Sequence, residues 1–209
     1  MHVRAIRLKG DPSKRDEAMK LWNSTTLPLL KQQKGFNGVT VAANKETDEV
    51  LIATYWETQQ AMKDGQEKVR PTAEKNREAT GGQLLENDEY EVAVMERFKE
   101  PKNGAFVRLT TIEGSAAKNL EGTANFKAKV VPAVQKLHGA RSSFLFANAT
   151  TGKAIAGSTW DTKEDLDTSE AQIVGLRQEA VKLVEGKAPK TEIFEIMFTE
   201  ILAPTKTGG

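Results

Sequence analysis

Two tryptophans in this sequence of 209 residues are candidates for contact with a ligand. Each lies at the end of an apolar run and just before a polar helical pattern. Trp56 closes the stretch LIATYW and Trp160 closes AIAGSTW, and an acidic residue and a threonine follow both. An indole at the end of a strand can stack on a flat ligand held between a sheet and its helices. The alternative is that each large side chain fills the rim of a small core.

Two further aromatic residues, Trp22 and Phe126, lie on the helix expected after the opening strand of each half. Trp22 belongs to an apolar stripe with three- and four-residue spacing, which is typical of a helix that packs on a sheet. These residues could wall a pocket opposite the strand-end tryptophans, or they could be ordinary helix–sheet core. The sequence therefore nominates Trp22, Trp56, Phe126 and Trp160 as candidates for binding a small aromatic molecule.

Arg4 and Arg108 occupy matched places on strands whose same-face neighbours are largely apolar, an unusual setting for a guanidinium. If the first and last strands of each half are antiparallel neighbours, Arg4 should lie near Glu96 and Arg108 near Glu200. A cross-strand ion pair is the structural interpretation. The functional interpretation is that Arg4 and Arg108 bind an anionic group of a ligand in the pocket.

No residue stands out as a catalytic group. The chain has no cysteine and two histidines, His2 and His138. Two isolated imidazoles do not make a metal cluster, and no carboxylates stand at ligand spacing. Gly81 and Gly82 follow a helix instead of opening one, so they do not form a phosphate loop. We therefore predict no metal and no cofactor, and the catalytic residues remain unknown.

The charge balance argues against a polyanionic partner. Thirty basic residues face 29 acidic ones, so no overall field concentrates nucleic acid. The first residues, MHVRAIRLKG, alternate as a strand does, and the sequence shows neither a signal peptide nor a long apolar membrane span. The absence of cysteine fits a reducing compartment. We expect a cytoplasmic protein with no nucleic-acid or membrane partner.

The sequence contains an internal repeat. The two strand-end tryptophans are 104 positions apart (160 minus 56), and a shift by this interval aligns HVRAIRLKG with FVRLTTIEG without a gap. The same shift places Pro28 on Pro132 and Gly35 on Gly139. A repeat of this kind decides the architecture before any local pattern does. The predicted divisions are a first half at 1–100, a linker at 101–104, a second half at 105–203 and a flexible tail at 204–209.

Within each half the periodicities predict strand, helix, strand, strand, helix, strand. We expect the first helix to kink or restart at Pro28 and at Pro132, because proline cannot continue the helical hydrogen bonds. Asn44 and Asn148 are expected to be hairpin-turn residues. The β-α-β-β-α-β order is the ferredoxin-like unit, whose uncovered sheet face needs a partner. The predicted fold is therefore α+β: two tandem ferredoxin-like repeats packed sheet to sheet as an intrachain α+β barrel.

The stretch LPLLKQQKGFNGVTVAANKETDEVLIATYWET resembles the dimeric α+β barrel superfamily, and within it the antibiotic biosynthesis monooxygenase-like domains. The matching features are a helix ending near proline, a Gly-Phe-x-Gly entry to the second strand, and an aromatic residue followed by an acid at the end of the third. In the first half they fall on Gly35, Phe36, Gly38, Trp56 and Glu57. The second half keeps Pro132, Gly139, Trp160 and Asp161 but has Ala140 and Ser142 in place of the Phe and the second Gly.

The resemblance implies that one chain holds both halves of a barrel usually built by two subunits. It also implies a range of activities: cofactor-free monooxygenases on aromatic polyketides or quinols, haem-degrading enzymes, isomerases, and proteins without demonstrated activity. Haem-degrading members use a histidine on the second helix and an asparagine on the first strand. This sequence has neither, so haem bound in that way is disfavoured.

Two hypotheses follow for function. One is a cofactor-independent monooxygenase, an oxidoreductase acting on a small aromatic or quinol-type molecule. The other is a non-catalytic ligand-binding or scaffold protein of the same fold. A cavity with a polar, titratable side chain would favour the enzyme, and divergence between the halves suggests that only the first keeps a usable pocket. We expect a monomer with an internal pseudo-dimer, and further self-association stays open.

Overall fold

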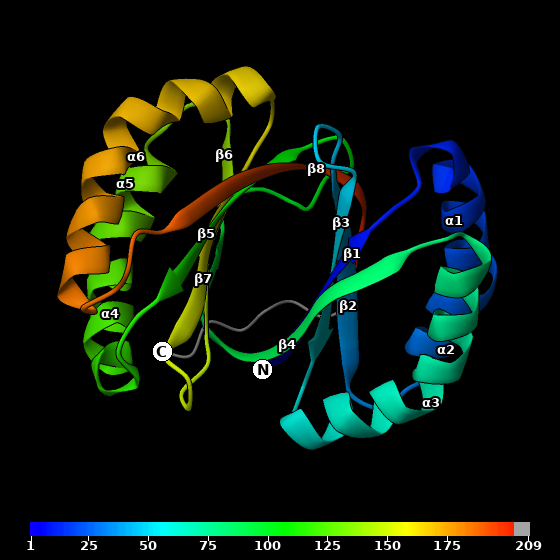
Figure 1. Ribbon diagram of the computed structural model, residues 1–209. Coiled ribbons are helices and arrows are strands. Elements are labelled where there is room, and N and C mark those ends of the chain that lie inside the picture. The colour runs from blue at the N-terminus through cyan, green and yellow to red at the C-terminus, as the bar shows by residue number, and fades with distance from the viewer. Residues whose placement is uncertain (203–209) are drawn as a thin grey trace. The chain divides into compact units, whose positions relative to one another are not determined.

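The computed structural model describes residues 1–202 and contains the same succession of elements in each half (Figure 1). The predicted tail at 204–209 lies outside the described residues. The elements of the first half are β1 (His2–Lys9), α1 (Arg15–Leu21), α2 (Leu27–Lys31), β2 (Phe36–Asn44), β3 (Glu49–Trp56), α3 (Gln59–Ala79) and β4 (Gln83–Arg97). Those of the second are β5 (Phe106–Glu113), α4 (Asn119–Asn125), α5 (Val131–Gln135), β6 (Ala140–Ala147), β7 (Lys153–Trp160), α6 (Lys163–Leu183) and β8 (Lys190–Ile201).

The strands form one closed hydrogen-bonded sheet in the order β1-β3-β2-β8-β5-β7-β6-β4. Each repeat adds a hairpin, β2–β3 or β6–β7, beside its first strand, since β3 pairs with β1 and β7 pairs with β5. In the second repeat the last strand, β8, pairs with the other side of β5, as the ferredoxin-like order requires. Closure leaves the sheet without a free edge. The predicted α+β barrel of two tandem ferredoxin-like repeats is thereby confirmed.

The last strand of each repeat is long and is shared between two compact units. The first unit comprises residues 1–89 and 197–202, and the second comprises residues 90–196. The end of β4, from Glu91 to Arg97, pairs with β6 of the second unit. The start of β8 pairs with β5, and its last residues belong to the first unit. The boundaries of the compact units therefore fall inside β4 and β8, whereas the predicted boundaries fall between the two sequence repeats.

The first helical segment of each half is interrupted where the sequence predicts a kink or restart. A π-helical turn spans Trp22–Thr26, and α2 then begins with Pro28 in its first turn. The second half repeats this with a π turn at Phe126–Val130 ahead of Pro132. Proline lacks the N–H that an unbroken α-helix would use, and a π turn absorbs the resulting change in hydrogen bonding.

The threonine after each strand-end tryptophan starts a helix. Thr58 is the N-cap of α3, and its Oγ1 accepts a hydrogen bond from the backbone N–H of Ala61 at 3.1 Å. Thr162 caps α6 in the same way, accepting from the N–H of Asp165 at 3.1 Å. Such caps satisfy backbone donors that a helix leaves free at its start. The repeated tryptophan–acid–threonine pattern is therefore a strand end joined directly to a helix cap.

The hairpin turns also follow the sequence prediction. Asn44 Oδ1 accepts hydrogen bonds from the N–H groups of Glu46 and Thr47 at 2.9 and 3.1 Å. Asn148 Oδ1 accepts from the N–H groups of the second and third residues after it, both at 3.0 Å. Both asparagines are thus confirmed as turn residues, because their side chains hold the loops that join the hairpin strands.

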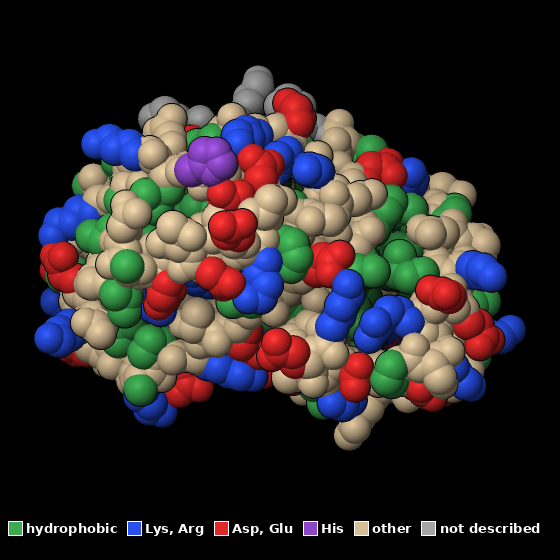
Figure 2. Space-filling view, turned by 90° about the horizontal axis from the view of Figure 1, so that it is seen from above, with side chains coloured by type: hydrophobic (Ala, Val, Ile, Leu, Met, Phe, Trp, Pro, Cys, Tyr) green, Lys and Arg blue, Asp and Glu red, His purple; other side chains and the backbone are tan. Residues whose placement is uncertain are grey.

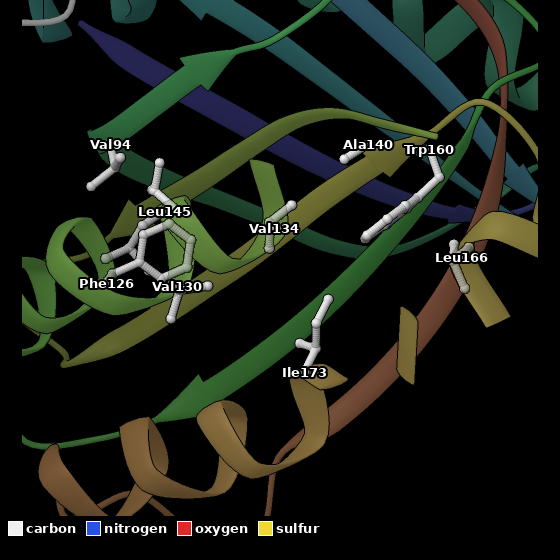
Figure 3. Close-up of a cluster of buried hydrophobic side chains, with 10 residues drawn as sticks. Val94, Phe126, Val130, Val134, Ala140, Leu145, Trp160, Leu166 and Ile173 are labelled. Carbon is white, nitrogen blue, oxygen red and sulfur yellow. The ribbon is translucent and has the colours of Figure 1, made fainter. Parts of the chain in front are cut away.

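In each unit the helices cover one face of the strands (Figure 1), and an apolar core lies between them. In the first unit Phe36 meets Trp56 edge to face, with ring centroids 5.3 Å apart. Figure 3 shows the core of the second unit, to which β7 contributes Trp160, the π turn Phe126 and α6 Ile173. Trp56 and Trp160 are 1% and 0% exposed. This packing matches the core interpretation of the two strand-end tryptophans.

The surface carries both signs of charge. On the face drawn in Figure 2, Lys and Arg side chains lie among Asp and Glu side chains, in keeping with the formal net charge of +1. Mixed charges of this kind do not produce the extended positive potential on which nucleic-acid binding depends. Among the described helices, none has the length and apolarity needed to cross a membrane.

Candidate ligand cavities between sheet and helices

The first unit contains a cavity of about 230 Å³ between the helix-covered face of its strands and the helices α1 and α3. Its floor is apolar because alternate residues of each strand point to the same face. The floor residues are Ile6 and Leu8 of β1, Val41 and Ala43 of β2, and Val50, Ile52 and Thr54 of β3. The helices add Ala18, Met19, Trp22, Val69 and Ala73. The space is large compared with the roughly 10–15 Å³ that one water needs.

Trp22 provides the aromatic wall of this cavity. It is the first residue of the π turn, at the end of α1. Its Nε1 is shielded from solvent and has no hydrogen-bond acceptor among residues 1–202. A buried indole N–H usually finds a partner, so this donor is available to a ligand with an acceptor oxygen.

A polar cluster lies beside this aromatic wall. Asn76 of α3 lines the cavity and donates from Nδ2 to the hydroxyls of Thr25 and Thr26, at 2.7 and 2.9 Å. Thr26 also lines the cavity and is 2% exposed. The cluster joins α3 to the π turn that carries Trp22. No sequence pattern points to this cluster, since asparagine and threonine are common on helices and only the packing brings them together.

The ionisable groups of the cavity lie at its rim. The carboxylates are those of Asp11, Asp48 and Glu74, and none of these residues is buried. Asp48 pairs with Arg15 at 3.4 Å. The Asp11 side chain accepts from the N–H and the hydroxyl of Ser13, and these hydrogen bonds lower the pKa of its carboxyl. The deep part of the cavity is therefore apolar and uncharged, with hydroxyl, amide and indole groups as its polar contacts.

The second unit has a smaller cavity of about 90 Å³ in the corresponding place. Phe126 lines it where Trp22 lines the first. Larger side chains reduce the volume at three matched positions: Leu145 stands in place of Val41, Ile173 in place of Val69 and Arg177 in place of Ala73. The duplicated cavities have therefore diverged in both size and lining.

The two strand-end tryptophans do not line either cavity. Each instead donates from Nε1 to a hydroxyl that does. Trp56 donates to Thr54 Oγ1 and Trp160 to Ser158 Oγ, both at 2.9 Å. The large ring fills the core at the end of the strand, and its N–H group fixes the side chain two residues earlier.

Arg4 does not pair with Glu96, so that prediction is wrong. Arg4 donates to Glu89 at 2.5 Å and to Asn87 at 3.2 Å. The reason is that β4 begins at Gln83, so that its first residues reach Arg4 and its end continues along β6. Burial lowers the pKa of the Arg4 guanidinium, and the charge of Glu89 opposes that effect. Arg4 does not line the cavity of the first unit.

The predicted pair of Arg108 with Glu200 is also wrong. Arg108 donates to Ser169 Oγ at 2.9 Å and to the carbonyl oxygen of Leu166 at 2.5 Å, and it pairs with Glu170 at 3.2 Å. Glu200 lies at the end of β8 in the first unit and pairs there with Lys31 at 2.7 Å. Burial lowers the pKa of Arg108, and Glu170 partly opposes the effect. Unlike Arg4, Arg108 lines the cavity of its own unit.

The imidazole of His138 lies outside the cavity linings. Its side chain is 95% exposed, and its Nδ1 is 2.6 Å from Asp165 Oδ1. Within residues 1–202, no cluster of three or more His, Cys, Asp or Glu side chains is arranged to hold a metal ion. The groups that could touch a ligand are therefore aromatic, hydroxyl and amide side chains, with carboxylates at the rim of the larger cavity.

Known proteins resemble this chain in sequence and in fold. Residues 1–67, from β1 into α3, match the antibiotic biosynthesis monooxygenase family. The uncharacterized protein Rv2557 of Mycobacterium tuberculosis is 24% identical over 204 residues, which cover 98% of this chain and 91% of that protein.

Two crystal structures are similar over the whole chain. A protein of Lactobacillus acidophilus superimposes with a TM-score of 0.70 at 8% identity, covering 96% of each chain. An anthrone oxidase-like protein superimposes with a TM-score of 0.67 at 14% identity, covering 100% of this chain and 96% of its own. The family match covers residues 1–67, and the whole chain shares the fold of these two structures: two tandem ferredoxin-like repeats that form one α+β barrel.

Proposed function

We propose that the chain binds a small aromatic molecule of one or two rings, carrying a phenolic or quinone oxygen, in the cavity of its first unit. The observation that carries this proposal is the unpartnered Nε1 of Trp22 on the wall of a cavity of about 230 Å³. An aromatic wall, an apolar floor and one free donor together select a flat ligand with an acceptor oxygen.

The volume limits the ligand. A cavity of about 150 Å³ lined by apolar residues holds benzene. The cavity of the first unit is larger, so it accepts one ring with substituents or two fused rings. A ligand with three rings would have to extend through the rim between Asp11 and Leu84, where the lining residues are exposed.

The polar contacts suggest how such a ligand lies. Its ring packs on the Trp22 indole and over Ile52 and Val69, and its oxygen accepts from a donor on the same wall. Thr54 is held from behind by Trp56, so its hydroxyl has a fixed place on the floor. Fixed groups cost less to order on binding than mobile ones do.

Oxidation of the bound ligand is the second candidate function. The similarity of fold to an anthrone oxidase-like protein favours it. In cofactor-free chemistry a deprotonated phenol supplies its own electrons to dioxygen. When a ring CH₂ becomes a carbonyl, the substrate loses four electrons and O₂ accepts them, with one oxygen atom entering the product and the other leaving as water. Asp48 and Glu74 are the carboxylates at the rim that could take the first proton.

Binding without chemistry has its own support. No carboxylate or imidazole among residues 1–202 is buried in the deep part of the cavity, where a tuned base would be expected. The proposal therefore puts binding first and treats oxidation as a separate question. Each can be tested without assuming the other.

Binding is tested by titrating the full chain with 1,4-naphthohydroquinone under nitrogen. The chain has three tryptophans, so ¹⁵N NMR resolves three indole N–H signals, which Trp→Phe variants assign. We expect the Trp22 signal to move and the Trp56 and Trp160 signals to stay. Ala43→Leu, which fills the cavity floor, should abolish the shift. Ala147→Leu, the matched change in the second unit, should leave it intact.

The proposed binding site is refuted if the Trp22 signal does not move at high ligand concentration. It is also refuted if the Ala43→Leu variant shows the same shift as wild type. Admission of air then tests chemistry through oxygen uptake and the absorbance of the oxidised product. If the wild type and Ala43→Leu show the same rate as buffer alone, the cavity binds this ligand without oxidising it. A rate that only wild type and Ala147→Leu raise would support oxidation in the cavity, and a product that gains one oxygen atom from ¹⁸O₂ by mass spectrometry would support the monooxygenase function.

A further inference from the structure

The hydroxyl of Ser143 has no hydrogen-bond partner, although the residue is 0% exposed. Ser143 lies on β6 and lines the cavity of the second unit, on the same strand face as Leu145 and Ala147. Buried hydroxyls are nearly always hydrogen-bonded in folded proteins, so an orphan beside a cavity points to a missing partner. The question is which molecule could supply that partner.

The neighbouring polar groups bond to other partners. Ser143 stands opposite Ser158 of β7, and Ser158 in turn stands opposite Arg108 of β5, so the three form a row across adjacent strands. Ser158 Oγ accepts from Trp160, and the Arg108 guanidinium donates to α6. Among these three side chains, Ser143 is the one whose hydroxyl has no hydrogen-bond partner.

The surroundings of this hydroxyl define the ligand by size and polarity. The cavity of about 90 Å³ is smaller than the roughly 150 Å³ that holds benzene, so an aromatic ring does not fit inside it. The walls near Ser143 are apolar and include Val134, Leu145, Ala156 and Ile173. A compact aliphatic group fits these walls and leaves one position for an oxygen atom at Ser143.

The charges favour a neutral ligand. Two cations line the cavity, Arg108 and Arg177, and they share the carboxylate of Glu170, at 3.2 Å and 2.7 Å. On the other side of Ser143, Glu96 of β4 stands directly opposite it across the strand pair. A second anion beside that carboxylate would be repelled.

We infer that the second unit binds a small neutral aliphatic alcohol or ketone, whose oxygen forms a hydrogen bond with Ser143 Oγ. This site is independent of the function proposed for the first unit. There the matched position is Val39, which has no hydroxyl, and the cavity is larger and lined by Trp22. The duplicated protein would thus hold two ligands of different chemical class.

The test uses the full chain with 2-propanol, which is smaller than benzene, as the probe and propane as its counterpart without an oxygen. The ¹⁵N indole signal of Trp160 is the readout, because its N–H group binds Ser158, the cross-strand neighbour of Ser143. We expect 2-propanol to shift the Trp160 signal with saturation and to leave the Trp56 signal in place. Propane should bind roughly tenfold more weakly, as expected for the loss of one buried hydrogen bond.

Variants of both units keep the outcome decisive. Ser143→Ala removes the hydroxyl and should weaken binding of 2-propanol roughly tenfold, to the level of propane. Ala147→Leu fills the cavity and should abolish binding of both probes, whereas Ala43→Leu in the first unit should change neither. Ser143→Val, which copies Val39 of the first unit, should behave as Ser143→Ala does and serves if that variant folds poorly.

Three results would overturn the inference. In the first, 2-propanol leaves the Trp160 signal unchanged at every concentration tested, so the cavity does not bind it. In the second, Ser143→Ala and wild type bind 2-propanol equally, so the hydroxyl plays no part. In the third, the Trp56 and Trp160 signals drift together without saturation, which is the response to an added solvent and not to a site. None of these results bears on the first unit, whose own reporter is Trp22.

Discussion

The indole of Trp56 occupies the space that a side chain at Gly65 would need. Gly65 lies in α3, and a Cβ added to it would be 2.3 Å from Cη2 of Trp56. The helix can cover the end of β3 at this distance because position 65 has no side chain. In the second unit the matched residue is Ser169, and its hydroxyl instead receives the guanidinium of Arg108.

We therefore predict that Gly65→Ala destabilises the protein. In an unconstrained helix the change would stabilise by about 1 kcal/mol. Here the methyl group collides with a buried ring, and overpacking of this kind typically costs about 1–3 kcal/mol. Urea denaturation followed by far-ultraviolet circular dichroism gives the free energy of unfolding.

The matched control is Gly175→Ala in α6, where nothing lies within 4 Å of an added Cβ. That variant should gain stability, by roughly 0.5–1 kcal/mol. A Gly65→Ala protein as stable as Gly175→Ala would mean that Trp56 does not press on α3.

The orphan hydroxyl of Ser143 leads to a second prediction, made for the protein without added ligand. Leaving a buried hydroxyl unpaired costs about 1–3 kcal/mol. Ser143→Val removes that cost and adds apolar contact beside Leu145, so it should raise the free energy of unfolding by about 1 kcal/mol or more. The reverse change at the matched place, Val39→Ser, should destabilise, because Val39 is 0% exposed in an apolar core.

Thermal unfolding measures both variants in parallel. A destabilised Ser143→Val protein would show that the hydroxyl already has a bound partner, such as an ordered water, whose loss outweighs the gain in packing. A simple preference for valine in strands would make Ser143→Val stabilising as well, so the size of the gain is compared with that of Ser142→Val. The Ser142 hydroxyl is bonded to Thr159 at 2.6 Å, and this second variant should lose stability.

The N-terminus of α6 should make stability depend on pH. The hydroxyl of Thr162 donates to Asp165 Oδ2 at 2.6 Å, and this bond is the main cause of a pKa of Asp165 below its ordinary 3.8. The contact with His138 adds to the effect. Because the folded pKa is depressed, the stabilisation is complete above the ordinary value and is lost as the pH falls through the lower folded value.

Asp165→Asn should accordingly lower the free energy of unfolding by about 1 kcal/mol at neutral pH, as the loss of a charged capping contact does. The difference from wild type should shrink as the pH falls below the ordinary value of 3.8 and through the lower folded pKa of Asp165. Urea denaturation at several pH values checks this. Asp167→Asn is the control, since that carboxylate is half exposed and pairs with Lys163 at the surface. A gap between Asp165→Asn and wild type that is constant with pH would contradict the assignment.

The polar cluster around Asn76 should matter for stability. Asn76→Ala removes two hydrogen bonds and leaves the Thr26 hydroxyl, which is 2% exposed, without its donor. We expect a loss of about 1–3 kcal/mol, measured by urea denaturation. Gln60→Ala, which removes an exposed bond to Asp64 in the same helix, should cost at most about 0.5 kcal/mol. Equal losses in the two variants would mean that Asn76 does not join α3 to the π turn.

The sequence by itself determined the features that depend on local patterns. The repeat at the interval between Trp56 and Trp160 predicts the duplication, because matched sequence patterns form matched elements. Alternation predicts the strands, Pro28 the interrupted helix and Asn44 the hairpin turn. Each of these follows from residues close to one another in the chain.

Only the tertiary structure decided the features that depend on strand register and packing. The proposed partners of Arg4 and Arg108 were wrong because of strand register: Arg4 bonds to Asn87 and Glu89, before Glu96 in β4, and Arg108 stands opposite Ile193, before Glu200 in β8. A register shift moves every side-chain contact along a strand pair, and nothing local in the sequence sets it.

The candidate site divides in the same way. The sequence picked out four aromatic residues, and the structure places Trp22 and Phe126 on cavity walls but Trp56 and Trp160 in the core behind them. The sequence does not single out Ser143, because serine is common in strands and its lack of a hydrogen-bond partner depends on residues distant in the chain. The volume of a cavity and the pairing of a buried hydroxyl both depend on side chains from distant parts of the chain. Neither is determined until those parts have packed together.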